Sequence, residues 1–215
     1  METAILQAQK LGLEIEGKTI LKDIDLSISK GEFVTITGPS GSGKSTLLQL
    51  VASMISPTSG DMLYKGKSIN TYEPTAYRKE VSYCFQTANL FGETVTENLA
   101  FPYEIRKETF DKDRAIEALG SVGLSADYLD KKVTSLSGGE KQRIALIRNV
   151  LFLPEVLLLD EVTSALDAEN RKAIGKTIRK LNKEKGVTIL WVTHNTEEIT
   201  EANRKIDIVD GQVKE

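Results

Sequence analysis

The segment from Gly38 to Ser45 constrains this chain more than any other. Its residues fit the pattern G-x-x-x-x-G-K-[ST] and are Gly38, Pro39, Ser40, Gly41, Ser42, Gly43, Lys44 and Ser45. Glycines let the backbone turn tightly, so that successive N–H groups can point at a polyphosphate. Lys44 can reach phosphate oxygens as a point charge, and the Ser45 hydroxyl can bind Mg²⁺. The pattern predicts a nucleotide site, with a glycine-rich turn that binds no ligand as the alternative.

The segments on both sides of this loop favour the nucleotide site. Residues 32–37 before it are apolar enough for a short buried strand, and the run from Thr46 to Ile55 predicts a helix. The first N–H groups and the dipole of such a helix favour a bound anion. We therefore include Thr46 among the residues expected to contact the nucleotide.

Composition limits the class of protein. The chain has 215 residues, of which 40% are hydrophobic and 27% charged, as is usual for a globular protein with one sizeable core. The net charge of −3 gives no general attraction to nucleic acid, so we expect no nucleic-acid partner. Cys84 is the single cysteine and excludes an internal disulfide framework. Because it stands in an apolar run, we expect it to be a small buried hydrophobe rather than a redox group.

The apolar runs also bear on location. None approaches the ~18 residues that a membrane-spanning helix needs. Residues 1–6 lack the basic start and the long apolar stretch of a signal peptide. We therefore expect a cytoplasmic chain.

The periodicity of apolar residues predicts an α/β fold. Residues 4–36 and 81–85 carry strand signals, and 205–213 alternate around an Asp-Gly turn that is typical of a hairpin. The run 156–159 is apolar throughout, as in a parallel strand with both faces covered, and 187–192 predicts a further buried strand. Between about 94 and 152 the spacing is helical, which predicts an inserted helical subdomain.

Two acidic residues follow the apolar run 156–159, where the sheet is expected to end. In an open parallel sheet, ligands bind outside the carboxyl ends of the strands. Asp160 can hold Mg²⁺, usually through water, and Glu161 can act as a general base toward an attacking water. A solvated acidic pair at a helix start is the alternative, and the phosphate loop makes us favour the functional interpretation.

The heptapeptide Leu136 to Gln142 reads Leu-Ser-Gly-Gly-Glu-Lys-Gln. Ser137 and Glu140 fit a capping box, which is a purely structural explanation. Capping does not explain Gly138 and Gly139, because adjacent glycines cost helix stability. Bare glycines at a helix start permit close approach of a second phosphate group.

Together these motifs resemble the ATP-binding cassette (ABC) family over nearly the whole chain. The heptapeptide is similar to that family's signature, Gln86 to its Q-loop glutamine, residues 164–167 to its D-loop and His194 to its switch histidine. The resemblance implies a P-loop NTPase (RecA-like) core with an N-terminal antiparallel β subdomain and an inserted helical subdomain. The single domain would span 1–215, with 1–87 and 155–215 as the core and 88–154 as the helical subdomain.

The resemblance also implies roles and cofactors. ATP and Mg²⁺ would be bound, with Ser45, Gln86 and Asp160 at the metal, and Glu161, His194 and Gln86 would be catalytic. His194 is the only histidine and, taken alone, would be a surface or core residue. In this family two cassettes face each other head to tail. Ser137, Gly138 and Gly139 of a second copy would then contact the ATP of the first, which implies a homodimer.

One position departs from the family pattern. An aromatic residue usually stacks on adenine there, whereas this chain places Ile15 at that position. We expect a plain apolar contact with the base, and the alternative is that Ile15 is a core strand residue.

Residues 82–95, 98–102, 144–149 and 190–194 resemble one bacterial subgroup, the ATP-binding subunits of Fet-type (Ybb-type) exporters, which is linked to iron export and oxidative-stress resistance. One cysteine and one histidine cannot make a metal cage, so metal selection is expected in the membrane partner. The family implies a permease helix that docks near Gln86 to Phe91, with Leu90 and Phe91 exposed, and a peripheral location on the cytoplasmic face of the membrane.

Three functions compete. The chain could be a transporter ATPase subunit, for export or import, a soluble mechanical ATPase acting on DNA or ribosomes, or a regulatory module without turnover. A single cassette with no heptad run and a slightly acidic balance argues against the second. The complete set of motif residues argues against the third. We adopt the transporter subunit.

Overall fold

The computed structural model describes residues 4–214; residues 1–3 and 215, at the two ends of the predicted domain, lie outside the described part. The strands of the described part are β1 (Ala4–Ile15), β2 (Lys18–Ser29), β3 (Phe33–Thr37), β4 (Ser59–Tyr64), β5 (Lys67–Ser68), β6 (Val81–Cys84), β7 (Val156–Asp160), β8 (Thr188–Val192), β9 (Arg204–Val209) and β10 (Gln212–Lys214). The helices are α1 (Lys44–Val51), α2 (Pro74–Glu80), α3 (Val95–Glu104), α4 (Lys112–Ser121), α5 (Gly138–Val150), α6 (Ala168–Lys185) and α7 (Thr196–Thr200). Short 3₁₀ turns lie at Ile69–Thr71, Ala126–Asp130 and Val133–Ser135.

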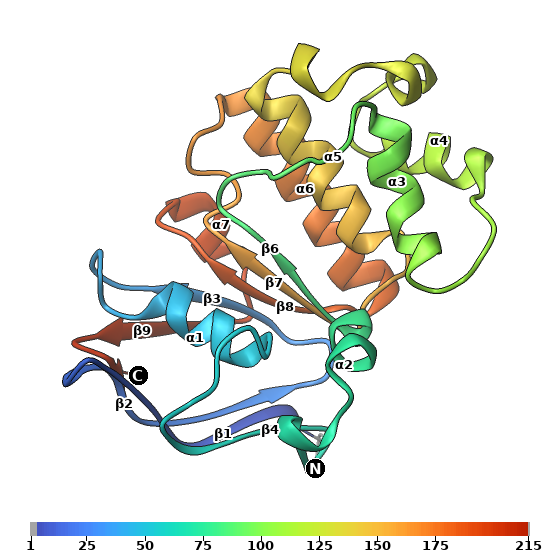
Figure 1. Cartoon of the computed structure of the whole chain (residues 1–215). Helices are drawn as coiled ribbons and strands as arrows, with labels where there is room; N and C mark the ends of the chain where they lie inside the picture. The colour runs from blue at the N-terminus through green and yellow to red at the C-terminus, as the bar shows by residue number, and fades with distance from the viewer. Residues whose placement is uncertain (1–3, 215) are drawn as a thin grey trace.

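The core is a six-stranded sheet within residues 4–214, in the order β10-β9-β3-β8-β7-β6. All its strands are parallel except β10, which pairs antiparallel with β9. Every residue of β3, β7 and β8 is buried. In Figure 1, α1 lies on one side of this sheet and α5 and α6 on the other, so apolar side chains are covered on both faces. The two predicted buried parallel strands, β7 and β8, are confirmed.

A second sheet, in the order β2-β1-β4-β5, is antiparallel and packs against α1. Its apolar face shares one buried cluster with α1 and the core sheet, in which Leu11, Ile24 and Leu48 are fully buried. The turn at Asp210-Gly211 closes the hairpin of β9 and β10 as predicted, and Glu16-Gly17 closes the hairpin of β1 and β2. The α/β fold with an N-terminal antiparallel sheet is therefore confirmed.

Helices α3, α4 and α5 enclose a separate apolar cluster. Val95, Leu119 and Ile144 are fully buried in it. Each of these helices starts at a side-chain cap, namely Thr94, Asp111 and Ser137. The helical block predicted between 94 and 152 is present, and 88–154 remains our proposed subdomain boundary.

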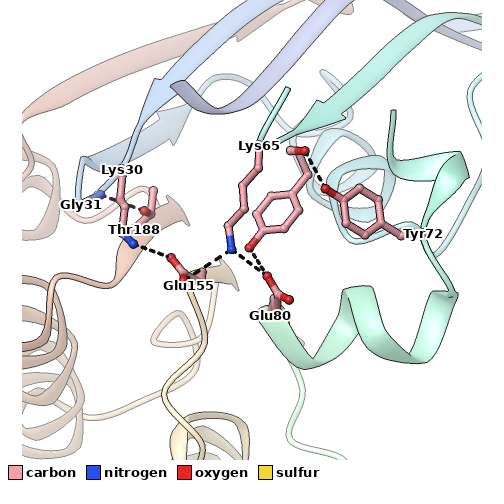
Figure 2. Close-up of polar contacts among 8 residues, drawn as sticks. Lys30, Gly31, Lys65, Tyr72, Glu80, Glu155 and Thr188 are labelled. Carbon is pink, nitrogen blue, oxygen red and sulfur yellow. Dashed lines mark hydrogen bonds and ion pairs between the residues drawn. The ribbon is translucent and has the colours of Figure 1, made fainter. Parts of the chain in front are cut away.

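A polar network holds the antiparallel sheet to the amino ends of the core strands (Figure 2). Lys65, which follows β4, pairs with Glu80 of α2 at 2.9 Å and with Glu155 at 3.5 Å. Glu155 immediately precedes β7. It also pairs at 2.9 Å with Lys30, which lies just before β3 in the sequence. The hydroxyl of Tyr64 donates to Glu80 at 2.6 Å. Because α2 is too short for a periodicity signal, the sequence analysis did not predict it.

Candidate nucleotide site

The phosphate loop connects the end of β3 to the start of α1, as predicted. Gly38, Gly41 and Gly43 have φ values of 139°, 76° and 103°, which L-residues rarely adopt. A Cβ on Gly38 would lie 2.0 Å from the carbonyl oxygen of Ile208 in β9, and one on Gly43 would lie 2.6 Å from the Leu21 side chain in β2. Both sheets therefore press on the loop, and only glycine fits at these two positions.

The N-terminus of α1 differs from the other α-helices of the described part. Each of those six begins at a residue whose side chain accepts a hydrogen bond from the first turn. Helix α1 begins at Gly43 and has no such cap. Its first N–H groups thus lack a side-chain acceptor, and the Ser42 hydroxyl is buried without a hydrogen-bond partner. These free donors suit a phosphate group.

Lys44 lies under the loop and is 5% exposed. Its Nζ donates hydrogen bonds to the carbonyl oxygens of Gly38 and Pro39, at 2.9 and 2.8 Å. The ammonium group is thereby held at the loop, where it adds a positive charge to the amide donors.

Asp160 is the buried last residue of β7 and faces the start of α1. Ser45 Oγ donates to Asp160 Oδ1 at 2.8 Å, and the hydroxyl of Tyr83 donates to Asp160 Oδ2 at 2.7 Å. Burial raises the pKa of Tyr83 and Asp160 raises it further, so the phenol stays a donor. Hydroxyl and carboxylate oxygens are hard ligands that suit Mg²⁺. The sequence predicted that Ser45 and Asp160 lie at the same metal site, but it did not predict the contact of Tyr83. That contact depends on the position of Tyr83 on β6, beside β7.

Glu161, Gln86 and His194 meet at the carboxyl ends of three adjacent strands. Gln86 Nε2 donates to Glu161 Oε2 at 3.0 Å, and His194 Nε2 lies 3.4 Å from Glu161 Oε1. Glu161 has a φ of 47°, in the left-handed region, and its N–H donates to the Val192 carbonyl at 3.0 Å. Such a conformation costs about 1–3 kcal/mol in a non-glycine residue and is concentrated at functional sites. The structure thus brings the three predicted catalytic side chains together.

A buried carboxylate, Glu198 of α7, fastens the loops that carry these residues. Thr163 Oγ1 donates to Glu198 Oε1 at 2.8 Å, and Thr193 Oγ1 donates to its other oxygen. Thr163 and Thr193 stand two positions after Glu161 and one before His194. Burial raises the pKa of Glu198. The sequence analysis missed this residue, because nothing in the sequence distinguishes it from a solvated acid in a first helical turn.

The heptapeptide residues do not reach this site within one chain. Among the described residues, no hydrogen bond joins Ser137, Gly138 or Gly139 to the phosphate loop. The capping box is present: Glu140 N donates to Ser137 Oγ at 3.3 Å, and Ser137 N donates to Glu140 Oε2 at 2.7 Å. A Cβ on Gly139 would lie 2.8 Å from the Asn170 side chain, whereas one on Gly138 would meet nothing within 4 Å. Capping and packing therefore leave Gly138 unexplained.

Ile15 ends β1 and is 52% exposed. This exposure excludes the alternative that it is a core strand residue. Whether it contacts adenine stays a prediction.

Cys84 ends β6 and is buried. Burial raises the pKa of its thiol to about 12. A thiol that stays protonated is a poor nucleophile, so the predicted small buried hydrophobe is confirmed.

A groove of about 490 Å³ lies where α2, α3, α5 and β6 meet, between the core and the helical block. Its exposed apolar residues are Met54, Phe85, Phe91, Phe101 and Ile105. The segment predicted to dock a permease borders this groove through Phe91, which is 43% exposed. The expected exposure of Leu90 is wrong, because Leu90 is half-buried against the apolar cluster of the helical block.

The fold and this site define a phosphate-loop nucleotide-binding protein. The ABC transporter family matches residues 21–164, and the chain belongs to this family. It is 48% identical over 204 residues to the probable iron export ATP-binding protein FetA of Escherichia coli (strain K12), covering 95% of this chain and 91% of that protein. It is 39% identical to the spermidine/putrescine import ATP-binding protein PotA of Spiroplasma citri, of whose length it spans 62%.

A solved structure of similar fold is the ATP-binding cassette MJ0796, described as the dimeric structure of a post-hydrolysis state bound to ADP and Pi. It has a TM-score of 0.88 and 30% identity, and the match covers 98% of this chain and 97% of that one. The chain is thus an ABC ATPase, which binds and hydrolyses ATP as a transporter subunit, and the predicted resemblance to Fet-type proteins is confirmed. Within residues 4–214, no helix is long and apolar enough to cross a membrane.

Proposed function

We propose that this chain hydrolyses ATP to drive export, related to iron, through a separate membrane permease. The observation that carries the proposal is the 48% identity to FetA, which extends over 91% of that protein. Import is the second candidate, because the chain is also 39% identical to the import protein PotA, although it spans only 62% of that protein.

The geometry supports a division of roles among the site residues. Lys44, the N–H groups of the loop and the start of α1 bind the phosphates, and Ile15 contacts the base. Ser45, Asp160 and Gln86 would hold Mg²⁺, whose charge offsets that of the phosphates when bound. Their oxygen donors fit this ion, since the Ser45 hydroxyl already lies 2.8 Å from Asp160.

Hydrolysis itself needs an oriented water. Glu161 accepts the proton of that water, and Gln86 and His194, at 3.0 and 3.4 Å, fix both of its carboxylate oxygens. His194 is half-exposed and can turn toward the γ-phosphate. Because phosphoryl transfer is accelerated mainly by positioning and charge, these three residues can supply the positioning that the reaction requires.

The complete site needs a second copy. Ser137, Gly138 and Gly139 of one copy close over the ATP of the other, in a homodimer. The dimeric MJ0796 cassette supports this arrangement. The permease docks in the groove beside Phe91, which places the dimer peripherally on the cytoplasmic face of the membrane.

The variant Glu161→Gln tests the site. It should hydrolyse no ATP and form a dimer on gel filtration with ATP and Mg²⁺, whereas the same variant without nucleotide serves as the control. A strict monomer under both conditions would contradict the paired site.

Direction and cargo need a cellular assay. Cells that express this chain together with its permease should hold less iron than cells that carry Glu161→Gln. Unchanged iron together with faster ATP-dependent spermidine uptake would favour the import candidate instead.

A further inference from the structure

Tyr83 lies between the metal carboxylate and the docking groove. Tyr83 is 9% exposed, and its hydroxyl donates a hydrogen bond to Asp160 Oδ2 at 2.7 Å. Its ring contacts the ring of Phe85 edge-on, with centroids 4.8 Å apart. One end of the side chain is therefore at the nucleotide site, while the other is beside an exposed aromatic residue.

The same ring helps to line the groove. Tyr83, Phe85 and Phe91 all border it, and Phe85 is 43% exposed there. An apolar segment that fills the groove would cover Phe85 and press on the ring that Phe85 contacts. Among residues 4–214, Tyr83 is the groove-lining residue that donates a hydrogen bond to Asp160; the other donor, Ser45, does not line the groove.

Asp160 depends on two hydroxyl groups for its orientation. Ser45 Oγ donates to Oδ1 at 2.8 Å and Tyr83 donates to Oδ2 at 2.7 Å. If Ser45 binds the ion, its hydroxyl can still donate to Oδ1, but Oδ2 is fixed by Tyr83 alone. Removing the phenol oxygen would leave a buried carboxylate oxygen without its donor, so that Asp160 would no longer be held in the orientation that faces the cation.

We propose that Tyr83 is a positioning residue that orients Asp160 for the divalent cation, and that its ring transmits occupancy of the groove by the permease to the metal site. This inference rests on the proposed role of Asp160 as a magnesium-holding residue. Gln86 provides a different connection, since its side chain donates a hydrogen bond to Glu161.

Tyr83→Phe tests the positioning role, because it keeps the ring and removes only the hydroxyl. With a non-hydrolysable ATP analogue bound, Mn²⁺ binding followed by electron paramagnetic resonance should weaken by about 10-fold, the lower end of the range for residues that support metal ligands. The matched control is Tyr77→Phe, which removes a buried hydroxyl that donates to the Val51 carbonyl at 2.5 Å. Tyr77→Phe should lower thermal stability without changing Mn²⁺ affinity.

Asp160→Asn distinguishes the metal-binding role of Asp160 from the positioning role of Tyr83. If Asp160→Asn weakens Mn²⁺ binding and Tyr83→Phe does not, the positioning role is overturned while the proposed function stands. If Asp160→Asn has no effect, the metal assignment itself is wrong.

The groove part has its own test. In the complex with its permease, wild type should show a Mn²⁺ affinity that differs from that of the isolated subunit, and Tyr83→Phe should lose most of this difference. An equal change in both proteins would overturn transmission through Tyr83.

Discussion

Gly38→Ala should destabilise the protein far more than Gly41→Ala, although both replace loop glycines with positive φ. At Gly41, φ is 76° and a Cβ would meet nothing within 4 Å, so we expect only the cost of a left-handed L-residue, about 1 kcal/mol. At Gly38, φ is 139° and the Cβ would lie 2.0 Å from the Ile208 carbonyl oxygen. Displacing that strand adds about 2 kcal/mol, as other overpacked sites do, for a total of about 3 kcal/mol.

The assay is urea unfolding of the nucleotide-free protein, followed by circular dichroism. Both variants lose the same flexibility in the unfolded chain, so this effect cancels in their difference. For a chain of this size, the difference of about 2 kcal/mol corresponds to roughly 4–8 °C in Tm. If Gly38→Ala were no less stable than Gly41→Ala at unchanged m-value, the argument that β9 fixes the loop would be refuted.

Three further predictions concern the base, the buried acid and the groove. Ile15→Tyr should strengthen ATP binding in a titration, because a half-exposed aliphatic contact becomes an aromatic one that can stack. Glu198→Gln should flatten the pH dependence of the unfolding free energy. Because the pKa of Glu198 is raised in the folded protein, its contribution to the free energy of unfolding is fully present below the ordinary pKa of 4.5. This contribution is lost as the pH rises through the pKa of the folded state. Phe91→Glu should abolish stimulation of the ATPase by the permease and leave ATP affinity unchanged, whereas Leu90→Glu should also lower Tm by several degrees, since Leu90 packs in the helical block.

Each of these predictions has a result that would contradict it. Weaker or unchanged ATP affinity of Ile15→Tyr would remove Ile15 from the base site. A pH profile of Glu198→Gln parallel to that of wild type, above pH 4.5, would show that this residue does not titrate differently in the two states. Normal stimulation of Phe91→Glu would place the permease elsewhere.

Much of the fold could be predicted because its signals are local. The apolar runs of β7 and β8 showed strands covered on both faces, and the capping box at Ser137 marked the start of α5. Helices α2 and α7, of seven and five residues, gave no periodicity and were not predicted. Leu90 was expected to be exposed, because the sequence does not show that the chain after Gln86 folds back onto the helical cluster.

The sequence by itself determined the chemistry of the phosphate loop. Backbone freedom, the lysine and the hydroxyl all lie within Gly38 to Ser45, so no distant contact is needed to recognise them. Tertiary structure alone decided how Glu161 meets Gln86 and His194, how Tyr83 reaches Asp160 and how Glu198 ties two loops. These contacts depend on the register of parallel strands, such as Cys84 opposite Leu159, and parallel strands are joined by long crossovers whose lengths do not reveal that register. The phosphate loop can therefore be recognised from the sequence, whereas the side chains proposed to act on the bound phosphates come together only in the folded sheet.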